Sequence, residues 1–160
     1  MAENPLANYL HDHLGGSSFA LELLEKLASE FAGTPSGDVA RKLHEQVQMD
    51  RTTLEQLIAK VGEPHTGVYD ALGWLAERVS RIKFKHDVPM GLGTFEAFET
   101  LSLGILGKRG LWEALQAHQE VDNRLQGLDY PTLIARAQEQ FDQANRYRLQ
   151  LTKSAFSQSF

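Results

Sequence analysis

Apolar residues recur at helical spacing through most of this chain, and the pattern predicts several long amphipathic helices. In the first segment, about residues 5–31, the apolar stripe repeats every three or four positions. Asn4 is suited to cap this helix, and Pro5 is favoured at a first helical position. Similar stripes predict helices at about residues 38–61, 68–85 and 130–156, the last capped by Asp129.

The segment from a cap at Thr94 to about residue 125 carries two apolar stripes that are rotated relative to each other. The change of phase falls at residues 107–110, where Gly107 and Gly110 flank a Lys-Arg pair. Glycine costs about 1 kcal/mol in a helix interior. We therefore expect a kink or a short loop at this point.

Composition narrows the class of protein. With 160 residues the chain is expected to form a single domain, residues 1–160. It has no cysteine, which excludes disulfides and thiolate metal sites. A net charge of −5 argues against a nucleic-acid binder. No apolar run approaches the length of a membrane span, and residues 1–5 lack the features of a signal peptide, so we expect a cytoplasmic protein.

The order of these helices resembles that of the ferritin-like superfamily, in which two long helices and a connecting segment precede two more. The stretches Leu6-Ala7-Asn8-Tyr9-Leu10 and Leu103-Gly104-Ile105-Leu106-Gly107-Lys108 are similar to an uncharacterised bacterial branch of it. The resemblance implies an all-α, ferritin-like four-helix bundle, with a short extra helix in the crossover between the second and third long helices.

The resemblance also implies a di-iron or di-manganese centre, in which two helices each supply Glu-x-x-His and two others each supply a Glu. Glu45 and Glu139 match that motif, but Gln48 and Asp142 stand at the two His positions. The other two helices offer these carboxylates: Glu22 or Glu25, and Glu99. Placed on a helical wheel, Glu22, Glu45 and Glu139 point away from the apolar stripes and predict a solvated surface.

A different set of polar residues falls on the apolar stripes. Its members are His13, Ser17, His44, Asp50, Arg51, Glu99, Glu113, His118, Asp122, Asn145 and Arg148. Charged groups are rarely buried unless they are paired or bound to metal. One interpretation is a cross-helix ion pair of Asp50 or Glu99 with Arg51 or Arg148, with an arginine in the space of the metal. The alternative is a metal site with altered ligands, drawn from His13, His44, Asp50, Glu99, His118 and Asp122.

Three functions remain open. The favoured one is a non-catalytic structural or interaction protein with a degenerate di-metal centre and no cofactor. The second is a redox or oxidative-stress protein that binds iron or manganese. The third is a binder of a small apolar or acidic ligand between the helices, attracted by Arg51 or Arg148.

Two surface features predict partners. Phe19 and Leu23 lie off the main stripe of the first helix, which favours a homodimer through an apolar strip. Basic residues gather near the end of the short helix and are suited to an acidic partner. They are Arg78, Arg81, Lys83 and Lys85.

Overall fold

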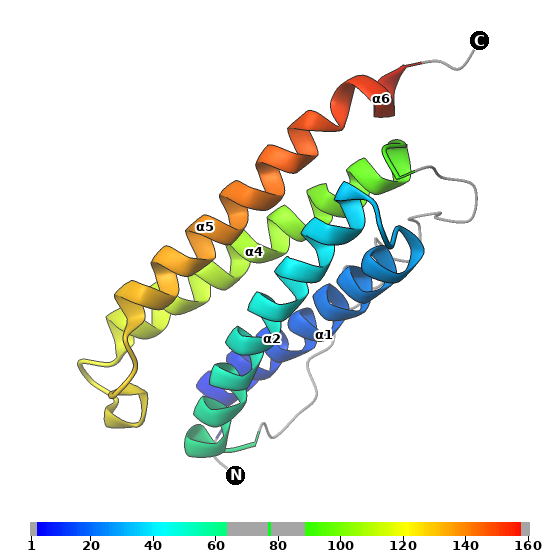
Figure 1. The fold of residues 1–160 in the computed structure, drawn as a ribbon. Helices are drawn as coiled ribbons and strands as arrows, with labels where there is room; N and C mark the ends of the chain where they lie inside the picture. The colour runs from blue at the N-terminus through cyan, green and yellow to red at the C-terminus, as the bar shows by residue number, and fades with distance from the viewer. Residues whose placement is uncertain (1–2, 64–76, 78–88, 158–160) are drawn as a thin grey trace.

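A computed structural model describes residues 3–63, 77 and 89–157, and within these ranges the chain is helical and has no strand. The all-α prediction is confirmed. The long helices are α1 (Pro5–Glu30), α2 (Pro35–Val61), α4 (Leu92–His118) and α5 (Tyr130–Gln150). A 3-10 turn, η1 (Asn123–Leu125), precedes α5, and a short helix, α6 (Thr152–Phe156), follows it (Figure 1).

Side-chain caps fix the starts of three long helices. The carboxamide of Asn4 accepts a hydrogen bond from the Ala7 backbone N–H at 3.1 Å. Its Nδ2 donates to the Val61 carbonyl oxygen at 3.3 Å, which ties the start of α1 to the end of α2. Asp129 accepts from the Thr132 backbone N–H at 3.1 Å. The caps predicted at Asn4 and Asp129 are therefore confirmed.

The second helix begins at Pro35, three residues before the predicted start, because Thr34 provides its cap. The Thr34 hydroxyl accepts from the Gly37 backbone N–H at 3.3 Å. Gly37 lies so close to the preceding turn that an added Cβ would stand 2.2 Å from the Phe31 carbonyl oxygen. A glycine is therefore required there, inside the first turn of α2.

The short loop expected as one possibility at residues 107–110 is wrong, because α4 runs without interruption from Leu92 to His118. Leu111, Trp112 and Leu115 are almost fully buried on the far side of the glycines. Burying such side chains stabilises the fold by about 1.5–3 kcal/mol each, which exceeds the cost of the glycines.

The ends of the predicted helices also differ from the structure. The fourth ends at His118, and residues 123–125 form η1 instead of its last turn. Thr94 is buried inside the first turn of α4, whose N-cap position is held by Gly91. The last predicted helix is divided at Leu151 into α5 and α6. The predicted crossover helix at 68–85 and its basic residues lie outside the described residues.

The long helices form two hairpins, α1 with α2 and α4 with α5, and the helices of each hairpin pack closely along their length (Figure 1). Contacts between the hairpins are fewer and join α1 to α4 and α2 to α5. In the described part of the chain, no helix is both long and apolar enough to cross a membrane.

The buried side chains form two apolar clusters, one toward each end of the helices. The first includes Val47, Ile105 and Ala144, and the second includes Leu54, Leu111 and Ala137. On each of α2, α4 and α5, a residue of the first cluster and a residue of the second lie on either side of one intervening position. Those three positions carry polar side chains, which are Asp50, Lys108 and Gln140.

Candidate functional site

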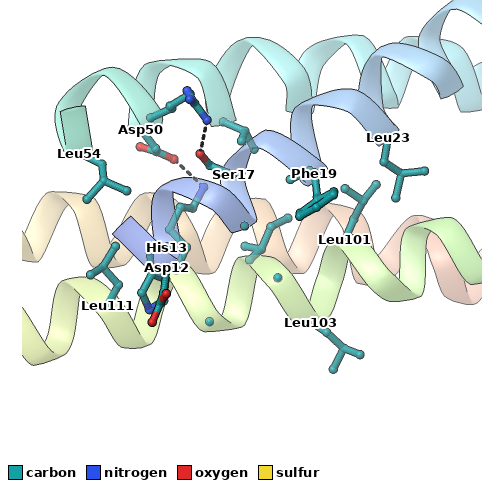
Figure 2. Close-up of a pocket in the computed structure, with 18 of the residues that line it drawn as sticks. Asp12, His13, Ser17, Phe19, Leu23, Asp50, Leu54, Leu101, Leu103 and Leu111 are labelled. Atoms are coloured by element: carbon teal, nitrogen blue, oxygen red, sulfur yellow. Dashed lines mark hydrogen bonds and ion pairs between the residues drawn. The ribbon is translucent and has the colours of Figure 1, made fainter. Parts of the chain in front are cut away.

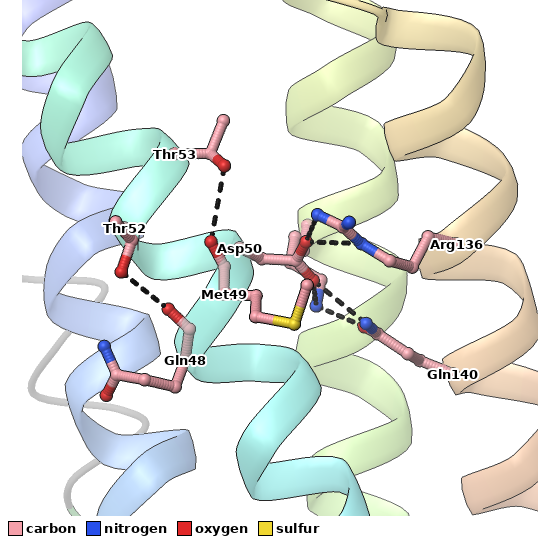
Figure 3. A network of polar contacts seen from close by, with 8 residues as sticks. Gln48, Met49, Asp50, Thr52, Thr53, Arg136 and Gln140 are labelled. Carbon is pink, nitrogen blue, oxygen red and sulfur yellow. Dashed lines mark hydrogen bonds and ion pairs between the residues drawn. The ribbon is translucent and has the colours of Figure 1, made fainter.

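Asp50 is the centre of a charge cluster between the two apolar clusters. It lies on α2 with only 2% of its surface exposed. Its carboxylate accepts hydrogen bonds from Lys108 Nζ at 2.6 Å, Gln140 Nε2 at 3.0 Å and Arg136 Nε at 2.8 Å. The Nη2 of Arg136 makes a further contact with the same oxygen as its Nε. Figure 3 shows Arg136 and Gln140 reaching from α5 toward Asp50.

Lys108 connects this cluster to α4. Its ammonium donates to Asp50 and to Gln140 Oε1, and its side chain is only 15% exposed. Burial lowers the pKa of Lys108; the adjacent Asp50 carboxylate opposes that shift, and the Arg136 charge adds to it. One carboxylate thus faces two cations, so the cluster carries an excess positive charge in a poorly solvated place.

A cavity of about 470 Å³ lies beside this cluster, between α1, α2 and α4. Its wall is mainly apolar and includes Phe19, Leu23, Leu54, Leu101 and Leu111. Figure 2 shows Phe19, Leu23 and Leu101 toward one end of it and His13, Leu54 and Leu111 toward the other. The volume is within the range of pockets that hold small molecules.

Glycines form part of the cavity wall on both sides. Gly16 contributes from α1, and Gly104 and Gly107 contribute from α4. An added Cβ at Gly104 or Gly107 would meet no atom within 4 Å. Both residues are exposed, as is Leu103 beside them, so the cavity opens to solvent along this face of α4. The missing side chains leave the space unfilled.

Two donors in the cavity wall have unused hydrogen-bonding capacity. The indole Nε1 of Trp112 is buried and has no partner among the described atoms, although the residue is only 1% exposed. Lys108 has three N–H donors, of which the described residues satisfy two. Residues 108 and 112 are one turn apart on α4 and share a face. A buried donor without a partner costs about 1–3 kcal/mol.

His13 stands at the same end of the cavity as Leu111. Its ring packs edge-on against Tyr9, with ring centres 4.8 Å apart. Burial lowers the pKa of His13, against an opposing effect of the neighbouring Asp12 carboxylate. The neutral imidazole is therefore favoured in the folded protein.

Arg51 also lines the cavity, but its partners are on α1 and α2. Its Nη1 donates to the Leu14 carbonyl oxygen at 3.1 Å and to the hydroxyls of Ser17 and Ser18 at 2.7 Å. Its Nε donates to Glu55 Oε1 at 2.9 Å. The expected pairing of Asp50 with Arg51 is wrong, because these side chains turn to different neighbouring helices.

Arg148 and Glu99 do lie together, across the α4–α5 contact. Arg148 Nη1 is 3.3 Å from Glu99 Oε2, and its guanidinium lies over the Phe95 ring at 5.5 Å. Both side chains are partly exposed, at 23% and 36%. This pair is near the surface and away from the cavity, so Arg148 does not take the central position. Lys108 and Arg136 fill the space around Asp50 instead.

The expected metal ligands are dispersed. Among residues 3–63, 77 and 89–157, no group of three His, Asp or Glu side chains is arranged to hold a metal ion. His118 is exposed and ends α4, so Asp122 lies beyond the end of that helix. Asp122 instead binds Arg124 at 2.6 Å, and this contact lowers its pKa to about 2. His44 is half-buried on α2.

The carboxylates implied by the di-metal resemblance do not fit such a centre either. Glu22, Glu25, Glu45 and Glu139 are all exposed, as are Gln48 and Asp142. The prediction of a solvated surface at Glu22, Glu45 and Glu139 is confirmed. The centre of the helices holds the Asp50 cluster.

Lys108, Arg136 and Gln140 were missed from the sequence for an identifiable reason. Lys108 lies inside the expected break. A break there hides the fact that Leu101, Lys108 and Trp112 share one face of a continuous helix. Gln140 lies three residues after Ala137 and four before Ala144, both fully buried. That spacing marks it as a core position. The sequence does not mark Arg136 as a core position, because Arg136 lies at the edge of the apolar stripe of α5.

Phe19 and Leu23 were expected to form a surface strip, and for Leu23 this is wrong. Leu23 is 1% exposed, and both residues line the cavity. The basis for a homodimer on that strip is therefore removed, although the oligomeric state itself stays a prediction.

Comparisons with protein-family models, with curated proteins and with solved structures each return no match to this chain.

Proposed function

We propose that this chain is a non-catalytic, ferritin-like helical bundle that binds a small apolar molecule in the cavity between α1, α2 and α4. The observation that carries the proposal is the cavity itself, about 470 Å³ with a largely apolar wall. Because the cavity opens to solvent, its apolar wall contacts water when no ligand is bound. An apolar molecule that fills it removes this surface from water and adds contacts with the lining.

The glycines of α4 support the same proposal. Gly104 and Gly107 cost helix stability relative to alanine, and no neighbouring atom requires their small size. Their effect is to keep the cavity open along α4. The metal-binding alternative has no comparable support, since its candidate ligands lie apart or at the surface.

The test blocks the cavity at these glycines. The chain has two tryptophans, so a Trp74→Phe background leaves Trp112 as a reporter in the cavity wall. We expect 1-decanol, a neutral apolar probe, to change Trp112 fluorescence saturably. Gly104→Leu with Gly107→Leu should abolish the change.

The matched control is Gly110→Leu. Gly110 is on the same helix and also has open space at its Cβ, but it does not line the cavity. This variant should bind as the parent does. Absence of saturable binding by the parent, or equal binding by the blocked variant, would refute the proposal.

A further inference from the structure

We propose that the cavity takes an aliphatic carboxylic acid, with its carboxylate held by Lys108 and its chain along the apolar wall. The inference rests on the proposed ligand-binding function and specifies the chemistry of the ligand. It is drawn from the polar groups of the cavity, which are few and unevenly distributed.

Lys108 defines the head of the ligand. One of its N–H groups has no acceptor among the described residues, and the residue lines the cavity. The Trp112 indole N–H has no acceptor there either, but its nitrogen has almost no accessible surface, so a ligand in the cavity does not reach it. A carboxylate accepts the Lys108 hydrogen bond and adds a negative charge. A neutral alcohol has one oxygen and brings no charge.

Charge favours an anion at the same place. Asp50 faces both Lys108 and Arg136, so the cluster has one cation more than it has anions. The Asp50 oxygens are already engaged by Lys108, Arg136 and Gln140. A ligand carboxylate would balance the excess charge in a site where solvent screening is weak.

The other charged residues of the wall are less suited to this role. The Nη1 and Nε groups of Arg51 are committed to α1 and to Glu55. Asp12 would repel an anion, and burial favours the neutral form of His13. Lys108 is therefore the cation of the cavity wall that keeps a donor without an acceptor among the described residues.

The wall defines the tail. From Trp112 back to Thr100 the lining of α4 extends for 12 residues, which is about 18 Å along the helix. The wall beyond Lys108 is formed by residues such as Ile105, Leu101, Phe19, Leu23 and Val47. An unbranched chain can follow this direction. Each added methylene should tighten binding about fourfold until the cavity is filled.

The experiment is isothermal titration calorimetry of the full chain with decanoate and with 1-decanol at neutral pH. We expect decanoate to bind at least about tenfold more tightly, as a hydrogen bond to a charged group predicts. Lys108→Met should remove this difference and leave decanol binding intact.

Two controls separate a specific site from general effects. Asp50 keeps Arg136 as its partner in Lys108→Met, so the variant does not leave a buried carboxylate alone. Lys60→Met removes an exposed lysine of α2 outside the cavity wall and should retain the decanoate preference. Thermal unfolding followed by circular dichroism verifies that each variant is folded.

Each other outcome has a defined meaning. Equal affinity for decanoate and decanol would overturn the carboxylate inference and leave the proposed function standing. A preference that survives Lys108→Met would overturn the assignment of the head to Lys108. Absence of binding by either probe would refute the proposed function as well.

Discussion

Removing the Asp50 carboxylate should destabilise this protein more than most single changes could. In Asp50→Ala, two cations would remain in a buried place with no anion between them. Asp50 is 2% exposed and accepts four hydrogen bonds from three side chains. Breaking a buried ion pair by removing one partner typically costs about 3–5 kcal/mol. That is a large part of the roughly 5–15 kcal/mol that stabilises a typical domain.

The assay is equilibrium unfolding in urea, followed by circular dichroism. With a slope of about 2 kcal/mol per molar urea, the loss corresponds to a midpoint lower by roughly 1.5–2.5 M. Glu45→Ala is the control on the same helix, because Glu45 is 68% exposed and its ion pair with the exposed Arg41 has a distance of 3.7 Å. Its effect should stay within about 0.5 kcal/mol.

A companion variant distinguishes loss of the pair from loss of packing. Replacing Asp50, Lys108, Arg136 and Gln140 together by Leu, Met, Met and Leu removes the charges and the amide that binds them, and it keeps the bulk. Such replacements are often neutral or stabilising by about 1–4 kcal/mol. If Asp50→Ala instead unfolds within about 1 kcal/mol of the parent, the cluster does not contribute as argued.

Three further predictions concern separate parts of the structure. Gly110→Ala should stabilise the protein by about 0.5–1 kcal/mol, whereas Gly37→Ala should destabilise it because its Cβ would meet the Phe31 carbonyl oxygen, and thermal unfolding of the pair tests this. The lowered folded-state pKa of His13 means that the unfolded chain binds its proton first, so stability contributed by this group should fall as the pH drops below about 6.5. Urea unfolding of His13→Gln should show a smaller loss over that window than the parent, and an equal loss would contradict the assignment. Asn4→Ala should cost about 1 kcal/mol or more in the same assay, because it removes a helix cap together with the bond to α2.

The helices and several of their ends were determined by local features of the sequence. Apolar spacing marked the four long helices, and short polar side chains at Asn4 and Asp129 marked two starts. These features act over a few residues, because capping and periodicity are properties of one segment. The surface position of Glu22, Glu45 and Glu139 also followed from helical periodicity, since these residues point away from the apolar stripes.

Only the tertiary structure decided which side chains meet. The sequence identified Asp50 as a buried charge but assigned it to Arg51 or Arg148, whereas Lys108 and Arg136 from other helices hold it. The glycines at 107 and 110 predicted a break, yet packing of Leu111 and Trp112 keeps α4 continuous and brings Lys108 onto its inner face. A local pattern states which residues share a face of one helix. Which neighbour each face meets depends on how all the helices together bury their apolar surfaces. That burial is a property of the whole chain and not of one segment.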